Sequence, residues 1–399
     1  MTHPKQDIEL VKILQATCAD GDDPLRSLMA YTLQRVLEEE MTAFLNAETY
    51  ERTDNRKGYR NGYKPRTLKT RVGRIELMVP KDREGRFQTE LFDKYQRNEK
   101  ALTLAIMEMY VQGVSTRKVK KITEELCGLD ISKSQVSNLS KGLDEEIEVW
   151  QNRSLERKYP YLVVDARYED IRSGLHVTSQ GVLLVVGISD DGYRELLGVW
   201  SADTENEQSW SQVFRELKER GLKGVEYVVS DDHSGLVKAI KRQFQCVVWQ
   251  RCQTHFIRNV LSLVSKKDRK KIAAYLKEIT GASSLESARK RIHETVDALE
   301  TFHPKVAEFL DTYGEEILGV YALPETHRTR MRSTNMLERY NQEIKRRTRV
   351  VRIFPNEQSC IRLVSALAIE MNEEWMARRY LKMNREEVRT QSTTDDLAA

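Results

Sequence analysis

Three acidic residues lie where a carboxylate can do chemistry. Asp165 follows the short apolar run 162–164, and Asp231 follows a second such run at 225–230, and both runs are typical of buried strands. Glu338 lies far downstream, in a stretch dense in arginine. A carboxylate on a buried strand is costly to desolvate unless a cation or a hydrogen-bond donor compensates it. A lone aspartate there can equally face water or cap a turn, so the inference depends on the three acids together.

Three converging carboxylates would form a hard-oxygen site for Mg²⁺, with Mn²⁺ as a substitute. Two such ions, about 3.5–4 Å apart, activate the attacking oxygen and stabilise the leaving oxygen of a phosphoryl displacement. The acids can be far apart in the sequence because only their convergence in space matters. We therefore expect Asp165, Asp231 and Glu338 to be both the catalytic residues and the ligands of two metal ions.

Two of these positions also fit another role. Asn335 and Glu338 have the spacing of a helix-capping box, with Asn335 as the N-cap of a helix that begins near 333–335. Asp231 is followed by Asp232, and only one of the two can point at the site if the strand alternates that far. The pattern at these positions is compatible with either role.

The elements that would position the acids form an α/β core. The sequence predicts a mixed sheet with helices on its faces, in which the strands that end in Asp165 and Asp231 are neighbours. Strands are expected at 161–165, 181–189, 194–202, 225–231 and 246–252, a turn at Asp190-Asp191-Gly192, and helices at 206–222, 234–244 and 359–372. Residues 253–325 have a helical pattern and no strand signal, which indicates a helical insertion.

The region before this core has features of nucleic-acid binding. Helices are expected at 8–20 and 24–48, and the stretch 51–86 is then rich in arginine, lysine, glycine and tyrosine, with Pro65 and Pro80 bracketing a β-ribbon. Cations interleaved with aromatic rings suit phosphate contact plus stacking or groove insertion. The residues expected to contact DNA are Arg56, Lys57, Tyr59, Arg60 and Tyr63. A solvated basic loop is the alternative interpretation.

Residues 115–150 have the pattern of a helix, a short turn and a second helix. Ser115 and Ser132 are expected N-caps, and Gly128 ends the first helix. The second helix presents polar side chains suited to reading bases in the major groove, and the candidates are Lys133, Gln135 and Asn138. We favour a helix-turn-helix over an ordinary pair of antiparallel helices because the basic ribbon precedes it.

Composition limits the class of protein. The chain has 399 residues, 40% hydrophobic and 32% charged, with a net charge of only +4. It contains no run of 18 or more apolar residues and no apolar signal core at its N-terminus, so we expect no membrane association. Five widely spaced cysteines are typical of a reducing cytosol. The predicted regions are 1–98 and 99–150 for DNA binding, 151–260 and 327–375 for the catalytic core, 261–326 for the helical insertion, and 376–399 for a tail.

Three motifs carry a resemblance to a known family. SDDHSGL (230–236), WQRCQTHFIRN (249–259) and STNMLERYNQEIKRRTRVVRIFPN (333–356) resemble the Mutator-type bacterial insertion-sequence transposases of the DDE superfamily, over about residues 50–375. The resemblance implies an RNase H-like fold split by an all-helical insertion, with Asp165, Asp231 and Glu338 as the acids. It also implies a Mg²⁺-dependent enzyme that recognises terminal inverted repeats, cuts them and joins 3′-hydroxyls to DNA. The chain departs from the family at Asp232, where glycine or alanine is frequent.

The resemblance also suggests supporting residues and partners. His233, Cys252 and His255 accompany the core as groups that orient the acids, as does Asn335. Cys252 and His255 are alternatively half of a zinc site completed by Cys246 and His233, which we consider the weaker interpretation. The residues expected to hold DNA backbone near Glu338 are Arg339, Arg346, Arg347 and Arg349. At least a dimer is expected on paired double-stranded ends, in the bacterial cytoplasm and associated with the nucleoid. A catalytically silent DNA-binding protein and a purely hydrolytic RNase H-like nuclease are the alternative functions.

Overall fold

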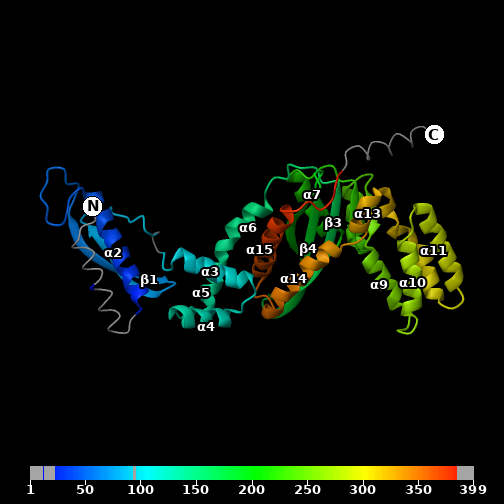
Figure 1. Cartoon of the computed structure of the whole chain (residues 1–399), viewed down its shortest axis with the longest axis horizontal. Helices are drawn as coiled ribbons and strands as arrows, with labels where there is room; N and C mark the ends of the chain where they lie inside the picture. The colour runs from blue at the N-terminus through cyan, green and yellow to red at the C-terminus, as the bar shows by residue number, and fades with distance from the viewer. Residues whose placement is uncertain (1–11, 13–22, 93–95, 384–399) are drawn as a thin grey trace. The chain divides into compact units, whose positions relative to one another are not determined.

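A computed structural model describes residues 12, 23–92 and 96–383, which fall into two compact units, 1–142 and 143–399. The first unit begins with the helix α2 (Pro24–Leu45), which packs on the antiparallel ribbon of β1 (Arg60–Thr70) and β2 (Gly73–Asp82) (Figure 1). Asp23 caps α2 by accepting a hydrogen bond from the Leu25 amide. Apart from residue 12, the helix predicted at 8–20 lies outside the described residues. No helix in the described part of the chain has the length and apolar character needed to cross a bilayer.

The ribbon differs in one respect from its prediction. Pro65 and Pro80 do not bracket it but lie within its strands, paired in register with Met78 and Tyr63. Each strand of a two-stranded ribbon has one open edge, where a residue without an N–H costs no ladder bond. Proline was therefore a poor marker of the strand ends.

Three short helices complete the first unit. They are α3 (Lys100–Val111), α4 (Thr116–Cys127) and α5 (Lys133–Ser140), packed around a small core that includes Ile106, Val119 and Val136. The predicted caps are confirmed: the Ser115 hydroxyl accepts from the Lys118 amide, Ser132 forms a capping box with Gln135, and Gly128 ends α4 at φ 62°. The segment with the helix-turn-helix pattern therefore folds into helices that pack together around one small core.

A mixed five-stranded sheet organises the second unit, in the order β5-β4-β3-β6-β7. Its strands are β3 (Tyr161–Ser173), β4 (His176–Ile188), β5 (Arg194–Ala202), β6 (Tyr227–Ser230) and β7 (Val248–Arg251). The first three are antiparallel neighbours, whereas β6 runs parallel to both β3 and β7. The predicted adjacency of the first and fourth strands is confirmed.

The first two strands are much longer than expected. β3 continues to Ser173 and pairs with β4 along its whole length, so Asp165 lies within the strand and the prediction that it ends the strand is wrong. The extension was missed because residues 166–173 are mostly polar, and a hydrophobic run marks only the buried half of a strand. Asp165 nevertheless lies just beyond the pairing with β6, which stops at Val163.

Helices cover both faces of this sheet. Leu162 and Val164 share one core with Trp210 and Phe214, which belong to α7 (Glu207–Glu219), and with residues of α8 (Ser234–Gln243). The alternate residue Asp165 faces α14 (Asn335–Val351), which packs together with α15 (Glu357–Met376). The helix α6 (Asp144–Gln151) is joined to α15 by an ion pair between Asp144 and the buried Arg362.

Residues between β7 and α14 are helical. The elements are α9 (Gln253–Ser262), α10 (Arg269–Thr280), α11 (Leu285–Leu299), α12 (Pro304–Tyr313), η2 (Gly314–Ile317), η3 (Gly319–Ala322) and α13 (Glu325–Met331). They enclose a core of their own that includes Phe256, Ile292 and Leu310. After α15, the amides of Tyr380 and Leu381 donate to the Gly192 carbonyl, so the described end of the chain packs on the β4–β5 turn.

Candidate active site

Asp165 and Asp231 lie on neighbouring strands. Asp231 directly follows β6, whose last pairing residue opposite β3 is Val229. The Asp165 side chain is buried, and its Oδ2 accepts a hydrogen bond of 2.7 Å from the Asn341 amide on α14. Burial and the neighbouring Asp231 carboxylate raise the pKa of Asp165 to about 7, against the lowering effect of His255, the Ala166 amide and Asn341. The two carboxylates therefore repel each other in a poorly solvated place.

His255 on the first turn of α9 links the two aspartates to the third acid. A hydrogen bond with the Cys252 thiol raises the pKa of His255 to about 9; desolvation opposes this, whereas Asp165 and Asp231 add to it. Burial acts to raise the pKa of Cys252, but the hydrogen bonds with His255 and Thr334 outweigh it and lower the pKa. Because the Cys252 Sγ accepts from the Thr334 amide at 3.3 Å, it also fixes the start of α14 against α9.

Glu338 lies one turn into α14 and reaches this histidine. Its Oε1 is 4.0 Å from the His255 Nε2 and 3.5 Å from an Arg258 nitrogen, so it is held loosely. The capping-box alternative for Glu338 is wrong: Thr334 is the N-cap, no side chain caps this end, and the Asn335 Oδ1 instead accepts from the Thr254 hydroxyl. Glu338 is thus available for a role other than helix capping.

A small cavity of about 260 Å³ opens beside Glu338. The residues that line it are Arg167, Arg258, Glu338, Asn341, Gln342 and Lys345. Three of these six carry a positive charge, but Arg167 pairs with Glu169 and Arg258 with Glu338, so Lys345 is the cation of this lining that forms no ion pair with another described residue. Sequence reasoning missed Arg167, Arg258, Asn341 and Lys345, because nothing in their spacing indicates that β3, α9 and α14 meet at this point.

The donor set suits a divalent cation, although the acids are not assembled around one. Within residues 23–92 and 96–383, no three His, Cys, Asp or Glu side chains are grouped closely enough to hold a metal ion as they stand. The raised pKa of Asp165 nevertheless marks two carboxylates whose repulsion a cation would relieve. The buried Asn341 Oδ1 adds an oxygen that has no hydrogen-bond partner in the described structure. These residues fit Mg²⁺, provided that Glu338 turns away from Arg258.

Asp232 points away from this group. Its carboxylate pairs with Arg251, a side chain that is 2% exposed and also bonds Glu316 at 2.8 Å. The Arg251 guanidinium lies over the rings of Phe256 and Phe309 as well. Asp232 therefore neutralises a buried cation that joins the sheet to the helical residues, and this arrangement agrees with Asp231 as the site residue.

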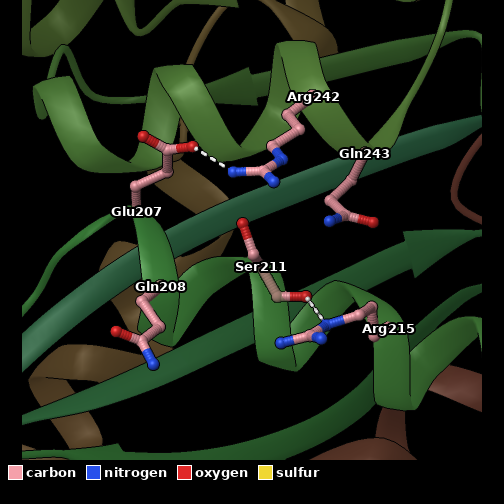
Figure 2. A pocket seen from close by; sticks show the side chains of 6 residues that line it. All are labelled: Glu207, Gln208, Ser211, Arg215, Arg242 and Gln243. Atoms are coloured by element: carbon pink, nitrogen blue, oxygen red, sulfur yellow. Dashed lines mark hydrogen bonds and ion pairs between the residues drawn. The ribbon is translucent and has the colours of Figure 1, made fainter.

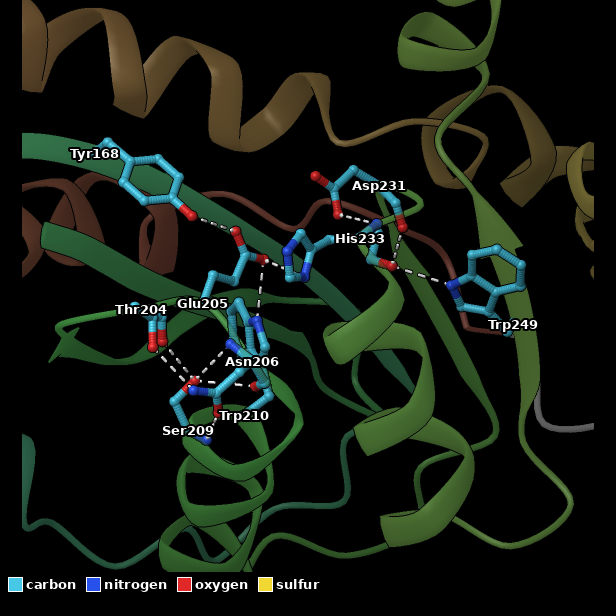
Figure 3. A network of polar contacts seen from close by, with 10 residues as sticks. Tyr168, Thr204, Glu205, Asn206, Ser209, Trp210, Asp231, His233 and Trp249 are labelled. Atoms are coloured by element: carbon cyan, nitrogen blue, oxygen red, sulfur yellow. Dashed lines mark hydrogen bonds and ion pairs between the residues drawn. The ribbon is translucent and has the colours of Figure 1, made fainter. Parts of the chain in front are cut away.

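A fourth acid near Asp231 was missed in the sequence. Glu205 follows β5, its side chain is 4% exposed, and it accepts hydrogen bonds from the Trp210 indole at 3.1 Å and the Tyr168 hydroxyl at 3.2 Å. Figure 3 shows Glu205 and His233 turned towards each other, and the His233 Nδ1 lies 3.6 Å from the Glu205 carboxylate. The His233 backbone amide donates to the Asp231 Oδ1, so Glu205, His233 and Asp231 lie together. No motif or periodicity marks this position.

A larger hollow, of about 530 Å³, lies between α7 and α8 but holds none of the predicted site residues. Figure 2 shows its two arginines turned towards partners within the chain: Arg242 is bonded to Glu207 and Arg215 to the Ser211 carbonyl. We therefore do not regard it as the catalytic site.

The predicted DNA-binding residues differ in how available they are. Lys133 and Asn138 on α5 are exposed, whereas the Gln135 Oε1 is occupied by the Ser132 amide of the capping box. Lys57 and the ring of Tyr59, just before β1, and the ring of Tyr63 within it are exposed.

Some predicted contacts are used inside the fold instead. Arg60 pairs with Glu38 on α2, and Arg56 donates to the carbonyls of Glu51 and Gly58. Arg347, which was also expected to contact DNA, is 5% exposed and paired with Glu343, so in this structure it serves the fold. The exposed arginines of α14 are Arg339, Arg346 and Arg349, of which Arg346 also pairs with Glu343.

Comparison with known proteins identifies the family. The family described as transposase, Mutator family, matches residues 1–378. The chain is 48% identical over 363 residues to the transposase for insertion sequence element ISRM5 of Rhizobium meliloti (strain 1021), with 91% of each chain covered. It is 42% identical over 371 residues to the transposase for insertion sequence element IS256 in transposon Tn4001 of Staphylococcus aureus, covering 91% of this chain and 94% of the relative. It is 37% identical over 362 residues to the transposase for IS1081 of Mycobacterium tuberculosis (strain ATCC 25618 / H37Rv), covering 90% and 87%. The chain belongs to the Mutator family of transposases.

Proposed function

We propose that this transposase binds the terminal inverted repeats of its own insertion sequence, cuts the DNA at these ends and joins the 3′-hydroxyls to target DNA. The observation that carries the proposal is the meeting of Asp165 from β3, Asp231 from the end of β6 and Glu338 from α14 around one histidine, His255. Burial and the neighbouring Asp231 carboxylate disfavour the charged form of Asp165, so stability alone does not explain why this acid lies beside Asp231. A shared role as metal ligands would explain why the three acids lie close together.

Asp165, Asp231 and Glu338 would hold two Mg²⁺ ions, for which Mn²⁺ can substitute. Bound there, the ions supply an activated attacking oxygen and charge stabilisation for the leaving oxygen. The protein's own groups orient the substrate: Lys345, together with Arg258 once Glu338 turns to the metal, would hold a phosphodiester in the cavity beside Glu338.

Neighbouring side chains and backbone groups orient the acids. Asn341 fixes the Asp165 carboxylate through a hydrogen bond of 2.7 Å, and the Asp231 Oδ1 accepts a hydrogen bond from the His233 backbone amide. Cys252 joins the starts of α9 and α14, which keeps His255 and Glu338 on adjoining turns. The sheet order β5-β4-β3-β6-β7, with β6 parallel to β3 and β7, supports a core of RNase H-like type in which the helices between β7 and α14 are an insertion.

The partners follow from the reaction. Double-stranded DNA, both transposon ends and target, is the substrate, and exposed Lys133 and Asn138 on α5 are placed to read the ends. Coordinated joining needs two ends held together, so the working form is at least a dimer associated with the bacterial nucleoid. A complex whose mass corresponds to one protein chain on one end DNA under cleaving conditions would rule this out.

The test is an assay on labelled copies of the element's own ends with Mg²⁺, resolving nicked product from joined product. The wild-type protein should give both. Asp165→Asn, Asp231→Asn and Glu338→Gln should give neither while still binding the ends. Nicked product without joined product would favour a hydrolytic nuclease, and binding without any cleavage by the wild type would favour a catalytically silent DNA-binding protein.

A further inference from the structure

A cleft of about 810 Å³ lies between α14, the end of α15 and the start of β5. Its apolar lining comes from the partly exposed Met371 and from the edges of Met336 and Trp375, which are 7% and 5% exposed. Its charged lining consists of four arginines and two glutamates, namely Arg194, Arg339, Arg346, Arg378, Glu343 and Glu374. An apolar surface bordered by an excess of positive charge suits a ligand that is itself part apolar and part anionic.

The positive charge of this cleft is only partly neutralised within the chain. Arg346 donates hydrogen bonds to the Glu343 carboxylate, and this interaction is the main reason why the pKa of Glu343 falls to about 2. Within residues 23–92 and 96–383, no carboxylate forms an ion pair with Arg194, Arg339 or Arg378. Three guanidinium groups therefore face the cleft without a bonded counter-charge.

Arg194 is held in a way that favours a bound anion. Its guanidinium lies over the rings of Trp375, at 4.4 Å, and Tyr380, at 4.9 Å, and its buried Nε has no hydrogen-bond partner in the described structure. Burial lowers the pKa of Arg194, and Arg339 and Arg330 lower it further, against the raising effect of Tyr380 and Glu374. An anion in the cleft would relieve this unfavourable charge.

The cleft is a neighbour of the candidate active site. Glu338 and Lys345 line the cavity beside the acids, Arg339 and Arg346 line the cleft, and Gln342 lines both. Residues three and four apart share one side of a helix, so the two hollows lie on adjoining sides of α14. An α-helix with its side chains is only about 10 Å across, a distance that two or three nucleotides can span.

We propose that this cleft binds a single DNA strand next to the scissile phosphate, with phosphates at the arginines and one unstacked base against Met336, Met371 and Trp375. The inference rests on the proposed function, because it takes the cavity beside Glu338 as the place of cleavage. A duplex keeps its bases inside and would leave the apolar lining unused. Proteins that hold single strands combine a cationic groove with apolar or aromatic surfaces in this way.

The test measures binding of the full-length protein to two DNAs by fluorescence anisotropy. One is a blunt duplex of the element's end, and the other carries in addition a short single-stranded extension of thymidines. The wild type should bind the extended DNA more tightly, by about fivefold or more. Arg339→Gln combined with Arg378→Gln should bring the ratio of the two affinities close to one. Met371→Glu, which leaves the arginines in place, should also lower this ratio.

Lys290→Gln is the matched control, because this exposed cation lies on α11 and does not line the cleft. It should leave the ratio unchanged. A wild-type ratio near one, or equal loss of affinity for both DNAs in the cleft variants, would show that the cleft does not hold a single strand. Cleavage of the intact end by the wild type is scored separately: if it is absent the proposed function fails, and if it is present while the ratio is near one only the cleft proposal fails.

Discussion

Replacing Asp165 with asparagine should stabilise the metal-free protein at alkaline pH. The folded-state pKa of Asp165 is raised to about 7 from an ordinary value of 3.8. Below the ordinary value the carboxyl is neutral in both folded and unfolded chains. As the pH rises to about 7, the unfolded chain ionises in water while the folded one must ionise in a buried place beside Asp231, so stability falls over this window. The loss is complete above about pH 7.

A difference of roughly three pKa units corresponds to about 4 kcal/mol in the free energy of unfolding. Asp165→Asn removes the charge but keeps an oxygen that can accept the hydrogen bond from Asn341. We expect the variant to be more stable than the wild type by about 2–4 kcal/mol at pH 8, or roughly 5–10 °C in the melting temperature. Near pH 4 the two proteins should differ by less than about 1 kcal/mol.

The assay is thermal or urea unfolding across pH 4–8 with a chelator present. Asp170→Asn is the matched control, since Asp170 is an exposed residue of the same strand, and it should shift stability by less than about 0.5 kcal/mol. Added Mg²⁺ should stabilise the wild type more than Asp165→Asn. A gain at pH 8 that is absent, or that does not shrink towards pH 4, would refute the view that Asp165 is destabilised by burial beside Asp231.

The other predictions concern residues with distinct roles in the fold. Asp231→Ala should abolish strand cleavage with little loss of stability. Asp232→Ala should keep much of the cleavage but lower the free energy of unfolding by about 1–3 kcal/mol, because the buried Arg251 loses one partner. Cleavage and urea unfolding of both variants would reveal the reversed order, which contradicts the prediction. Asn138→Ala should reduce discrimination between cognate and scrambled ends by about 1–3 kcal/mol. Gln135→Ala should in addition destabilise α5 by about 0.5–2 kcal/mol. Binding and unfolding of both variants test this, and unchanged discrimination in Asn138→Ala would move recognition away from α5. Arg349→Ala should flatten the salt dependence of DNA binding by roughly 0.9 in the logarithmic slope. Arg347→Ala should leave this slope unchanged and lower stability. A salt titration with the opposite pattern would indicate that Arg347, rather than Arg349, contacts DNA.

Sequence pattern predicted best those features that depend on local physics. The caps at Ser115, Ser132 and Gly128 were predictable because each satisfies helix-end groups from within the same short segment. The central strands were predictable because burial on both faces leaves continuous apolar runs. The exposed half of β3 and the position of Pro65 could not be inferred, since polar ribbons carry no such signal.

The sequence singled out three acids as candidates but not the side chains that surround them. Asp165, Asp231 and Glu338 stood out because each follows or lies within a distinctive element, but nothing in the spacing indicates that Glu338 rests against Arg258 and His255. The role of Glu205 could not be predicted from the sequence, because its burial depends on Trp210 and Tyr168, which come from other parts of the fold. Tertiary packing, rather than local propensity, determines which charged side chains are buried.

The most direct test of the account is whether the three acids share one metal site. Fe²⁺ bound in place of Mg²⁺, with ascorbate and peroxide, generates hydroxyl radicals that cut the polypeptide near the bound ion. We predict cuts close to Asp165, Asp231 and Glu338, suppressed by excess Mg²⁺ and strongly reduced in Asp165→Asn. Cuts confined to other regions, or a pattern that Asp165→Asn leaves unchanged, would contradict a metal site formed by these acids.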